Sequence, residues 1–217
     1  MQVQFVTPNS IGGWLQVKLG KTEMDYLWTR IKAAEEREED VRSTLAGQIS
    51  ASLALDDTDN YFQNNILQPL AKEYLDQQPF LMDNMRGNRM SSETKDRDTF
   101  DVLLDQWWVN KQKQGEYNPI HAHSGLFSFV VWMHEAAEHD EQNKQENARM
   151  SGGPCHHQFV FHYPSMLNEP KYSVYRLGKE LEGTMLFFPA RLFHSVTPFF
   201  NNDGIRISIA GNMCVQT

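Results

Sequence analysis

Residues 107–133 read WWVNKQKQGEYNPIHAHSGLFSFVVWM, and this stretch decides the fold. Aromatic and β-branched residues dominate its two ends, Trp107 to Gln112 and Leu126 to Met133, and such residues favour β-strands. Between the two predicted strands stand His121 and His123. Residues at i and i+2 of an extended segment project from the same face, so this segment can present two imidazoles to one metal ion.

The rest of the C-terminal half has the same strand-forming composition. From Leu103 onward, further segments are rich in aromatic and β-branched residues. They are Gln158 to Tyr163, Tyr172 to Leu177, Thr184 to Pro189 and Ile205 to Asn212. This number of strands is typical of a barrel or jelly roll, so the expected fold class is mainly β, with some helix (α+β).

The N-terminal half is mixed. Trp14 to Leu19 alternates as a short strand does, and Glu23 to Asp40 has the apolar spacing of an amphipathic helix. A second helix is predicted over Tyr61 to Leu75, where Pro69 should kink or divide it. We expect these helices to buttress the sheet.

The chain of 217 residues has the length of a single barrel domain, and no repeat or linker divides it. The prediction is therefore one domain over 1–217, with 1–102 as helical and strand support and 103–217 as the β core. The segment 136–154, AAEHDEQNKQENARMSGGP, is polar and contains glycine. It is predicted to be an inserted loop that buries nothing and is mobile or acts as a lid.

The charge and the cysteine count exclude several classes of protein. A net charge of −8 argues against nucleic acid as a partner, because binding phosphates requires a basic patch. The start, MQVQFVTPNSIGGW, has no signal-peptide pattern, and no apolar run is long enough to span a bilayer. Cys155 and Cys214 are expected to be reduced thiols. We expect a cytoplasmic protein without a membrane partner, in the host cell if the chain is phage-encoded.

A third histidine and an arginine complete the candidate site. His194 follows His123 by 71 residues, which is too far for a zinc finger and suits two strands of a barrel. Three protein ligands leave open positions on an octahedral iron. Arg206 and Ser208 share one face of the last predicted strand, and a guanidinium with a neighbouring hydroxyl can bind a carboxylate.

The segments WWVNKQKQGEYNPIHAHSGLFSFVVWM, GTMLFFPARLFHSVTPF and GIRISIAGN together resemble the 2-oxoglutarate (2OG) and Fe(II)-dependent oxygenase superfamily. The closest likeness is to prolyl-hydroxylase-like proteins of marine phages and bacteria. The resemblance covers residues 107–213 and, weakly, TLAGQISASLALD at 44–56. It implies a double-stranded β-helix, a distorted cupin-like jelly roll with iron at the mouth of the barrel.

The resemblance also implies roles for single residues. His121 matches the first ligand histidine and His194 the last, while Arg206 and Ser208 match the anchor for the distal carboxylate of 2OG. The implied cofactor is Fe(II), with 2OG and O2 as cosubstrates. The implied reaction hydroxylates a C–H bond of a peptidyl (prolyl-type) or small-molecule substrate and releases succinate and CO2.

His123 departs from the superfamily pattern, which usually has an aspartate or glutamate at this position. Three-histidine iron sites are chemically reasonable, so His123 is predicted to be a catalytic metal ligand with His121 and His194. The alternative is that His123 forms a hydrogen bond behind the ligands while water or substrate fills the position.

Other polar and aromatic side chains accompany these residues. Ser128 and Trp132 match positions near the cosubstrate in the family, and three further residues are candidates to line the pocket: Asn110, Gln112 and Asn118. The remaining histidines, which match no position of the motif, are expected at the surface: His134, His139, His156, His157 and His162.

Two other functions stay open. A cupin-like three-histidine dioxygenase without 2OG would explain His123 but would leave Arg206 and Ser208 without a role. A non-enzymatic β-sandwich binding protein would hold a structural metal or none. The sequence does not identify the primary substrate or the oligomeric state.

Overall fold

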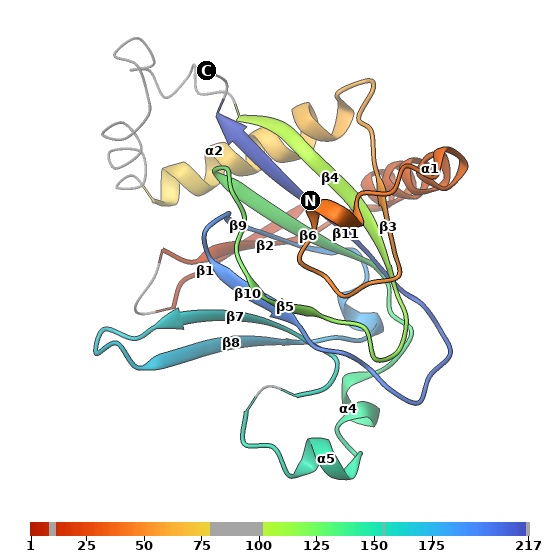
Figure 1. Cartoon of the computed structure of the whole chain (residues 1–217). Helices are drawn as coiled ribbons and strands as arrows, with labels where there is room; N and C mark the ends of the chain where they lie inside the picture. Colours follow the sequence, from red (N-terminus) through yellow and green to blue (C-terminus); the bar gives the residue numbers. More distant parts are fainter. Residues whose placement is uncertain (9–11, 79–101, 154, 216–217) are drawn as a thin grey trace.

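The computed structural model describes residues 1–8, 12–78, 102–153 and 155–215, and two antiparallel sheets form its centre (Figure 1). Within these residues the larger sheet has seven strands in the order β1-β2-β9-β6-β11-β4-β3. Their bounds are β1 Gln2–Val6, β2 Trp14–Lys18, β3 Ala51–Ala54, β4 Val102–Gln112, β6 Phe127–His134, β9 Thr184–Pro189 and β11 Arg206–Val215.

The smaller sheet, in the order β5-β10-β7-β8, lies against the larger one and makes the second wall of a jelly roll. Its strands in the described part of the chain are β5 Asn118–His121, β7 Gln158–Pro164, β8 Pro170–Arg176 and β10 Phe193–Val196. The predicted fold class and jelly-roll architecture are thereby confirmed. Each strand expected from composition is present, within a few residues at its ends.

The N-terminal helices pack on the outer face of the larger sheet, as expected. Helix α1 spans Lys21–Arg37 and ends where Glu38 adopts a left-handed conformation, with φ 53°. Helix α2 spans Gln68–Gln77. Their apolar residues join the sheet in one core, where Tyr74 packs edge-on against Phe127 with ring centroids 5.2 Å apart. No helix among the described residues is long and apolar enough to cross a membrane.

Pro69 changes the type of helix instead of producing a sharp break. The five residues before α2, Gln63–Leu67, form a π-helix, in which Gln68 donates its backbone N–H to Gln63 O. Proline has no N–H to donate, and its ring crowds the carbonyl four residues earlier. A wider turn ahead of the proline relieves this conflict, so the helical segment continues to Gln77.

A second core lies between the two sheets and contains mostly aromatic residues. Trp14 of β2 packs against Phe161 of β7, with ring centroids 4.3 Å apart. Trp132 and Phe188, from the larger sheet, are also buried here. Within the larger sheet, Gly211 in the centre of β11 leaves room for side chains of both neighbouring strands, because a Cβ there would lie 2.6–2.7 Å from atoms of Phe129 and Trp107. The aromatic filling gives the barrel an apolar core beside the candidate site.

The segment predicted as an inserted loop with nothing to bury is packed, and that prediction is wrong. It contains two short helices, α4 His139–Gln142 and α5 Glu146–Arg149, and buries Ala137 and Ala148. Its polar side chains are used internally: Gln142 donates to Phe200 O and accepts from Phe200 N, both at 2.8 Å. A polar sequence can be buried when its side chains satisfy the backbone of a neighbouring loop. Pro154 lies outside the described residues.

The remaining short helices, as the structure describes them, are 3-10 turns. They are η1 Arg42–Thr44 before β3 and η4 Lys179–Leu181 before β9.

Candidate metal centre

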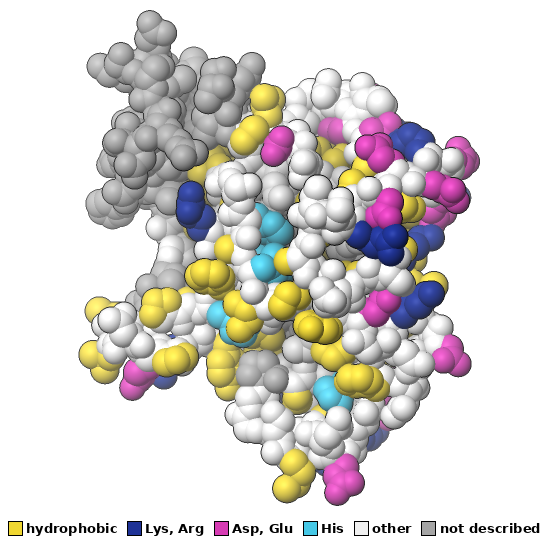
Figure 2. Space-filling view, in the orientation of Figure 1, with side chains coloured by type: hydrophobic (Ala, Val, Ile, Leu, Met, Phe, Trp, Pro, Cys, Tyr) yellow, Lys and Arg dark blue, Asp and Glu magenta, His cyan; other side chains and the backbone are white. Residues whose placement is uncertain are grey.

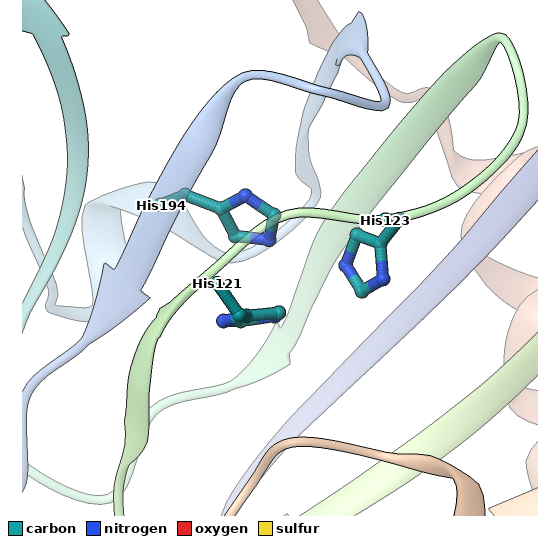
Figure 3. A group of neighbouring side chains, drawn as sticks. All are labelled: His121, His123 and His194. Atoms are coloured by element: carbon teal, nitrogen blue, oxygen red, sulfur yellow. The ribbon is translucent and has the colours of Figure 1, made fainter.

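Three histidines converge at one end of the barrel (Figure 3). His121 lies at the end of β5 and pairs in register with His194 on the neighbouring strand β10. His123 follows two residues later, in the connection to β6, where its backbone N–H donates to Ala190 O at 2.8 Å. One nitrogen from each ring lies within 4.8 Å of the others. The pairing of β5 with β10 is therefore what brings together His121 and His194, which are 73 positions apart in the sequence.

Backbone carbonyls fix the orientation of two of the rings. His121 Nδ1 lies 2.7 Å from Pro119 O, and His194 Nδ1 lies 2.9 Å from Leu192 O. A carbonyl only accepts hydrogen bonds, so each Nδ1 carries the proton and each Nε2 keeps a free lone pair. Such hydrogen bonds behind a ligand commonly fix the tautomer of metal-binding histidines.

Burial keeps the three imidazoles neutral. Desolvation lowers the pKa of His121 and places that of His194 well below its usual value. The pKa of His123 is lowered to about 4, first by desolvation and then by the neighbouring charge of His121. Only the neutral imidazole can donate a lone pair to a metal, so the site is ready to bind a metal at neutral pH.

One side of the centre is aromatic and the other faces solvent. The His194 ring, 5% exposed, lies 5.0 Å from the Phe188 ring and 5.6 Å from that of Phe159. His121 and His123 are only half-buried. Figure 2 shows histidine side chains near the middle of this face of the molecule, with hydrophobic side chains close by. Substrate can thus approach from the side of His121 and His123, while His194 is anchored in the core.

Arg206 and Ser208 line the same cavity as the three histidines. The three polar candidates predicted to line a pocket, Asn110, Gln112 and Asn118, also line it. Trp132 does as well, whereas Ser128 donates a hydrogen bond to Asn212 Oδ1 at 2.7 Å and is not among the lining residues. Alternation along the strands brings these side chains together, because β11 pairs Arg206 with Gln112 and Ser208 with Asn110.

Arg206 is buried inside the barrel, with 2% of its surface exposed. Its Nη2 donates to Thr197 O and its Nη1 to His157 Nδ1, each at 3.3 Å. The guanidinium carbon lies 5.6 Å from the centre of the Phe199 ring. A guanidinium has five N–H groups, so about three remain for a ligand in the cavity. Arg206 therefore does not face solvent on the exterior of the barrel.

The surface prediction is wrong for two of the five remaining histidines. His157 is fully buried and His139 is 8% exposed, because each forms hydrogen bonds inside the fold: His157 with Arg206, and His139 with Gln158 at 2.9 Å. His134 is exposed, while His156 and His162 are half-buried.

Sequence reasoning also missed Glu135, whose side chain is fully buried beside His157, and the cavity residues Leu45, Ala46, Gly47 and Ser52. The weak likeness over 44–56 was the available signal for the latter group.

Comparison with known proteins agrees with this geometry. The model of a 2OG-Fe(II) oxygenase family matches residues 106–212, which run from β4 to β11 and include all three histidines and Arg206. The barrel belongs to the 2OG-Fe(II) oxygenase family. The protein is thus a 2OG-dependent dioxygenase, and Fe(II), 2OG and O2 are the cofactor and cosubstrates of its family.

The comparison with solved structures finds oxygenases at low sequence identity, and the one from Pseudomonas putida shows the same fold. A prolyl-4-hydroxylase from Pseudomonas putida is 12% identical, with a TM-score of 0.51, over 94% of this chain and 93% of that one. A viral collagen prolyl hydroxylase from Paramecium Bursaria Chlorella virus-1, in complex with 2OG, is 14% identical with a TM-score of 0.44, over 92% and 94%. A prolyl hydroxylase from Trichoplax adhaerens is 12% identical with a TM-score of 0.47, over 94% and 83%. No curated protein matches the chain.

Proposed function

We propose that this oxygenase hydroxylates a C–H bond of a peptidyl, prolyl-type substrate or of a small molecule, with release of succinate and CO2. One observation carries the proposal: the three histidines, Arg206 and Ser208 line a single cavity. The histidines suit a metal, and the arginine with the serine suits a carboxylate.

The three imidazoles fit Fe(II). His121 and His194 have their Nδ1 atoms occupied by carbonyls, and burial keeps all three rings neutral. In the proposed assignment His121, His123 and His194 hold the iron, leaving positions open for 2OG and O2. When bound, the iron supplies the oxidative chemistry that couples decarboxylation of 2OG to hydroxylation.

His123 is proposed as the third ligand. No carboxylate belongs to the histidine group in the described part of the chain, and His123 has a ligand atom within the same 4.8 Å limit as the other two. Neutral ligands leave the iron with more positive charge than a carboxylate does, which favours binding of anionic 2OG. The alternative, a hydrogen bond behind the ligands, predicts that removal of His123 leaves the metal affinity almost unchanged.

Arg206 and Ser208 are proposed to hold the distal carboxylate of 2OG. The free N–H groups of Arg206 can bind both carboxylate oxygens, and the half-buried Ser208 hydroxyl on the same strand face can donate to one of them. Burial of Arg206 away from bulk solvent strengthens these charge-assisted bonds. The task of the protein is to orient 2OG and to exclude water from the reaction.

The anchor also separates 2OG chemistry from that of a cupin-like three-histidine dioxygenase. Such an enzyme needs no buried cation facing the cavity, whereas Arg206 is 2% exposed and lines it. A non-enzymatic β-sandwich protein would likewise need no buried cation that faces the cavity. The buried arginine therefore favours 2OG as cosubstrate.

A peptidyl substrate is proposed because a solved structure with the same fold, from Pseudomonas putida, is a prolyl-4-hydroxylase. The half-buried His121 and His123 leave access for an extended chain. The net charge of −8 favours an organic or peptidyl substrate over nucleic acid.

The function is tested by adding 2OG to the anaerobic Fe(II)-loaded protein. We expect a weak metal-to-ligand charge-transfer band, and then succinate formation on exposure to O2, stimulated by proline-containing peptides or a metabolite. Iron binding without the band would favour the cupin-like reaction. Absence of the band and of succinate would overturn the proposal.

A further inference from the structure

A buried chain of three side chains lies behind the proposed carboxylate anchor. Glu135, at the end of β6, approaches His157 with its Oε2 3.2 Å from Nε2. On the other side of the imidazole, Nδ1 lies 3.3 Å from Arg206 Nη1. Both Glu135 and His157 have fully buried side chains, and Arg206 is 2% exposed. The mechanism proposed above uses only the arginine.

The direction of the hydrogen bonds follows from the end groups. Arginine can only donate, so His157 Nδ1 accepts and the ring proton sits on Nε2. This N–H donates to Ala137 O at 2.9 Å, and the Glu135 carboxylate lies 3.2 Å from the same nitrogen without accepting a hydrogen bond from it. His157 is therefore a neutral imidazole between a carboxylate and a guanidinium.

The backbone holds His157 in this place. Its φ of 56° is in the left-handed region, its N–H donates to Pro198 O at 2.8 Å, and its C=O accepts from Leu177 N at 3.0 Å. Non-glycine residues adopt this conformation rarely, and the surrounding structure has to impose it. Backbone hydrogen bonds to Pro198 and Leu177, with the contact of Nε2 to Ala137 O, therefore hold the imidazole ring against Arg206.

Glu135 and Arg206 carry opposite charges inside the fold. Among the described residues, no carboxylate lies within 4.0 Å of the Arg206 guanidinium, and no hydrogen bond satisfies either carboxylate oxygen of Glu135. Burial lowers the pKa of Arg206, and the charge of Glu135 opposes that effect. The two buried charges thus compensate each other across one imidazole, without direct contact.

We propose that Glu135 is an internal counter-ion for Arg206 and that His157 is a positioning residue, which fixes the guanidinium for the distal carboxylate of 2OG. The proposal rests on the proposed function. Glu135 stabilises the free protein, because its negative charge favours the charged form of the buried arginine. It also repels the incoming carboxylate, so it weakens 2OG binding, whereas the hydrogen bond from Arg206 to His157 strengthens it.

The variant Glu135→Gln keeps the shape and removes the charge. We expect the Mn(II)-loaded protein to bind 2OG about fivefold more tightly by calorimetry, since one nearby repulsive charge is lost. Pyruvate, which has no distal carboxylate, should bind with unchanged affinity, and the metal-free variant should unfold at a lower temperature. Asp140→Asn is the matched control, because Asp140 pairs with His139 in the same insertion and is 85% exposed.

The signs of these effects separate the proposal from a purely structural role. A residue that only maintains the fold would lower both the stability and the 2OG affinity when replaced. Unchanged or weaker 2OG binding by Glu135→Gln overturns the counter-ion role, as does an unfolding temperature at or above that of the wild type. Failure of the wild-type protein to bind 2OG would instead overturn the proposed function.

Two variants of His157 test the positioning role without relying on Glu135→Gln. His157→Asn keeps an acceptor near the place of Nδ1, and asparagine tolerates the left-handed backbone. His157→Gln carries its amide toward the place of Nε2. We expect the Asn variant to bind 2OG within about threefold of wild type and the Gln variant about tenfold more weakly. Equal affinities, or the opposite order, overturn the positioning role.

Discussion

Arg206→Gln removes the charge that the proposed anchor depends on. The guanidinium gives one N–H to His157 Nδ1 and one to Thr197 O, which leaves about three for 2OG. Charge-assisted hydrogen bonds contribute about 1.5–3 kcal/mol each, and a glutamine amide replaces at most one of them by a weaker, neutral bond. We therefore expect a loss of about 3–4 kcal/mol, which raises the Kd for 2OG between about 100-fold and 1000-fold.

Calorimetry of 2OG binding to the Mn(II)-loaded protein measures this effect. Arg206→Lys keeps the charge without the planar pair of donors, so its loss should be smaller, about tenfold. Arg149→Gln, on the exposed face of α5, is the matched control and should bind 2OG as the wild type does. The loss should be confined to ligands with a distal carboxylate, so pyruvate binding should not change. A Kd for Arg206→Gln within about threefold of wild type would refute the anchor assignment.

Three further predictions concern the metal ligands and the core. His123→Ala should weaken Fe(II) binding by at least about tenfold in a competitive metal titration while His123→Asp retains it; unchanged affinity in the alanine variant would remove His123 from the ligand set. Because the folded-state pKa of His123 is about 4, below the ordinary 6.5, the unfolded chain takes up the proton first as the pH falls. The metal-free protein should therefore lose stability between about pH 6.5 and pH 4, and His123→Gln should reduce this loss. The free energy of unfolding of both proteins is measured by urea denaturation at a series of fixed pH values. A difference in this free energy between wild type and variant that does not change with pH would contradict the prediction. Phe187→Ala, in the fully buried core of β9, should cost about 3–5 kcal/mol in the free energy of unfolding, and a cost below about 1 kcal/mol would show that the core was misjudged.

The strands that flank the site could be predicted because their signal is local. Alternation with period two is visible along Arg206, Ser208 and Ala210, and it places the arginine and the serine on one face. The same holds for the aromatic strands that form the core between the sheets. The segments that escaped prediction are short, with four or five residues each: β1, β3, β5 and β10. Two of them carry His121 and His194, so the histidines were found by their spacing and by resemblance, and not by their strands.

The packed insertion shows why polar segments are harder to interpret. The sequence predicts an exposed loop there, since it has few apolar residues. Gln142 is nevertheless buried, because the backbone of Phe200, far along the chain, satisfies its amide. Burial of a polar side chain depends on a partner, and the partner is not visible in the local sequence.

The sequence by itself determined a β-rich fold, two histidines on one short segment, and an arginine in phase with a serine. Only the tertiary structure decided that His121 and His194 pair across β5 and β10, and that Glu135 and His157 stand behind Arg206. The physical reason is the same in both cases. Strand periodicity is a property of neighbouring residues, whereas a metal centre and a buried charge network arise from contacts between residues distant in the chain, here 49 positions apart for His157 and Arg206.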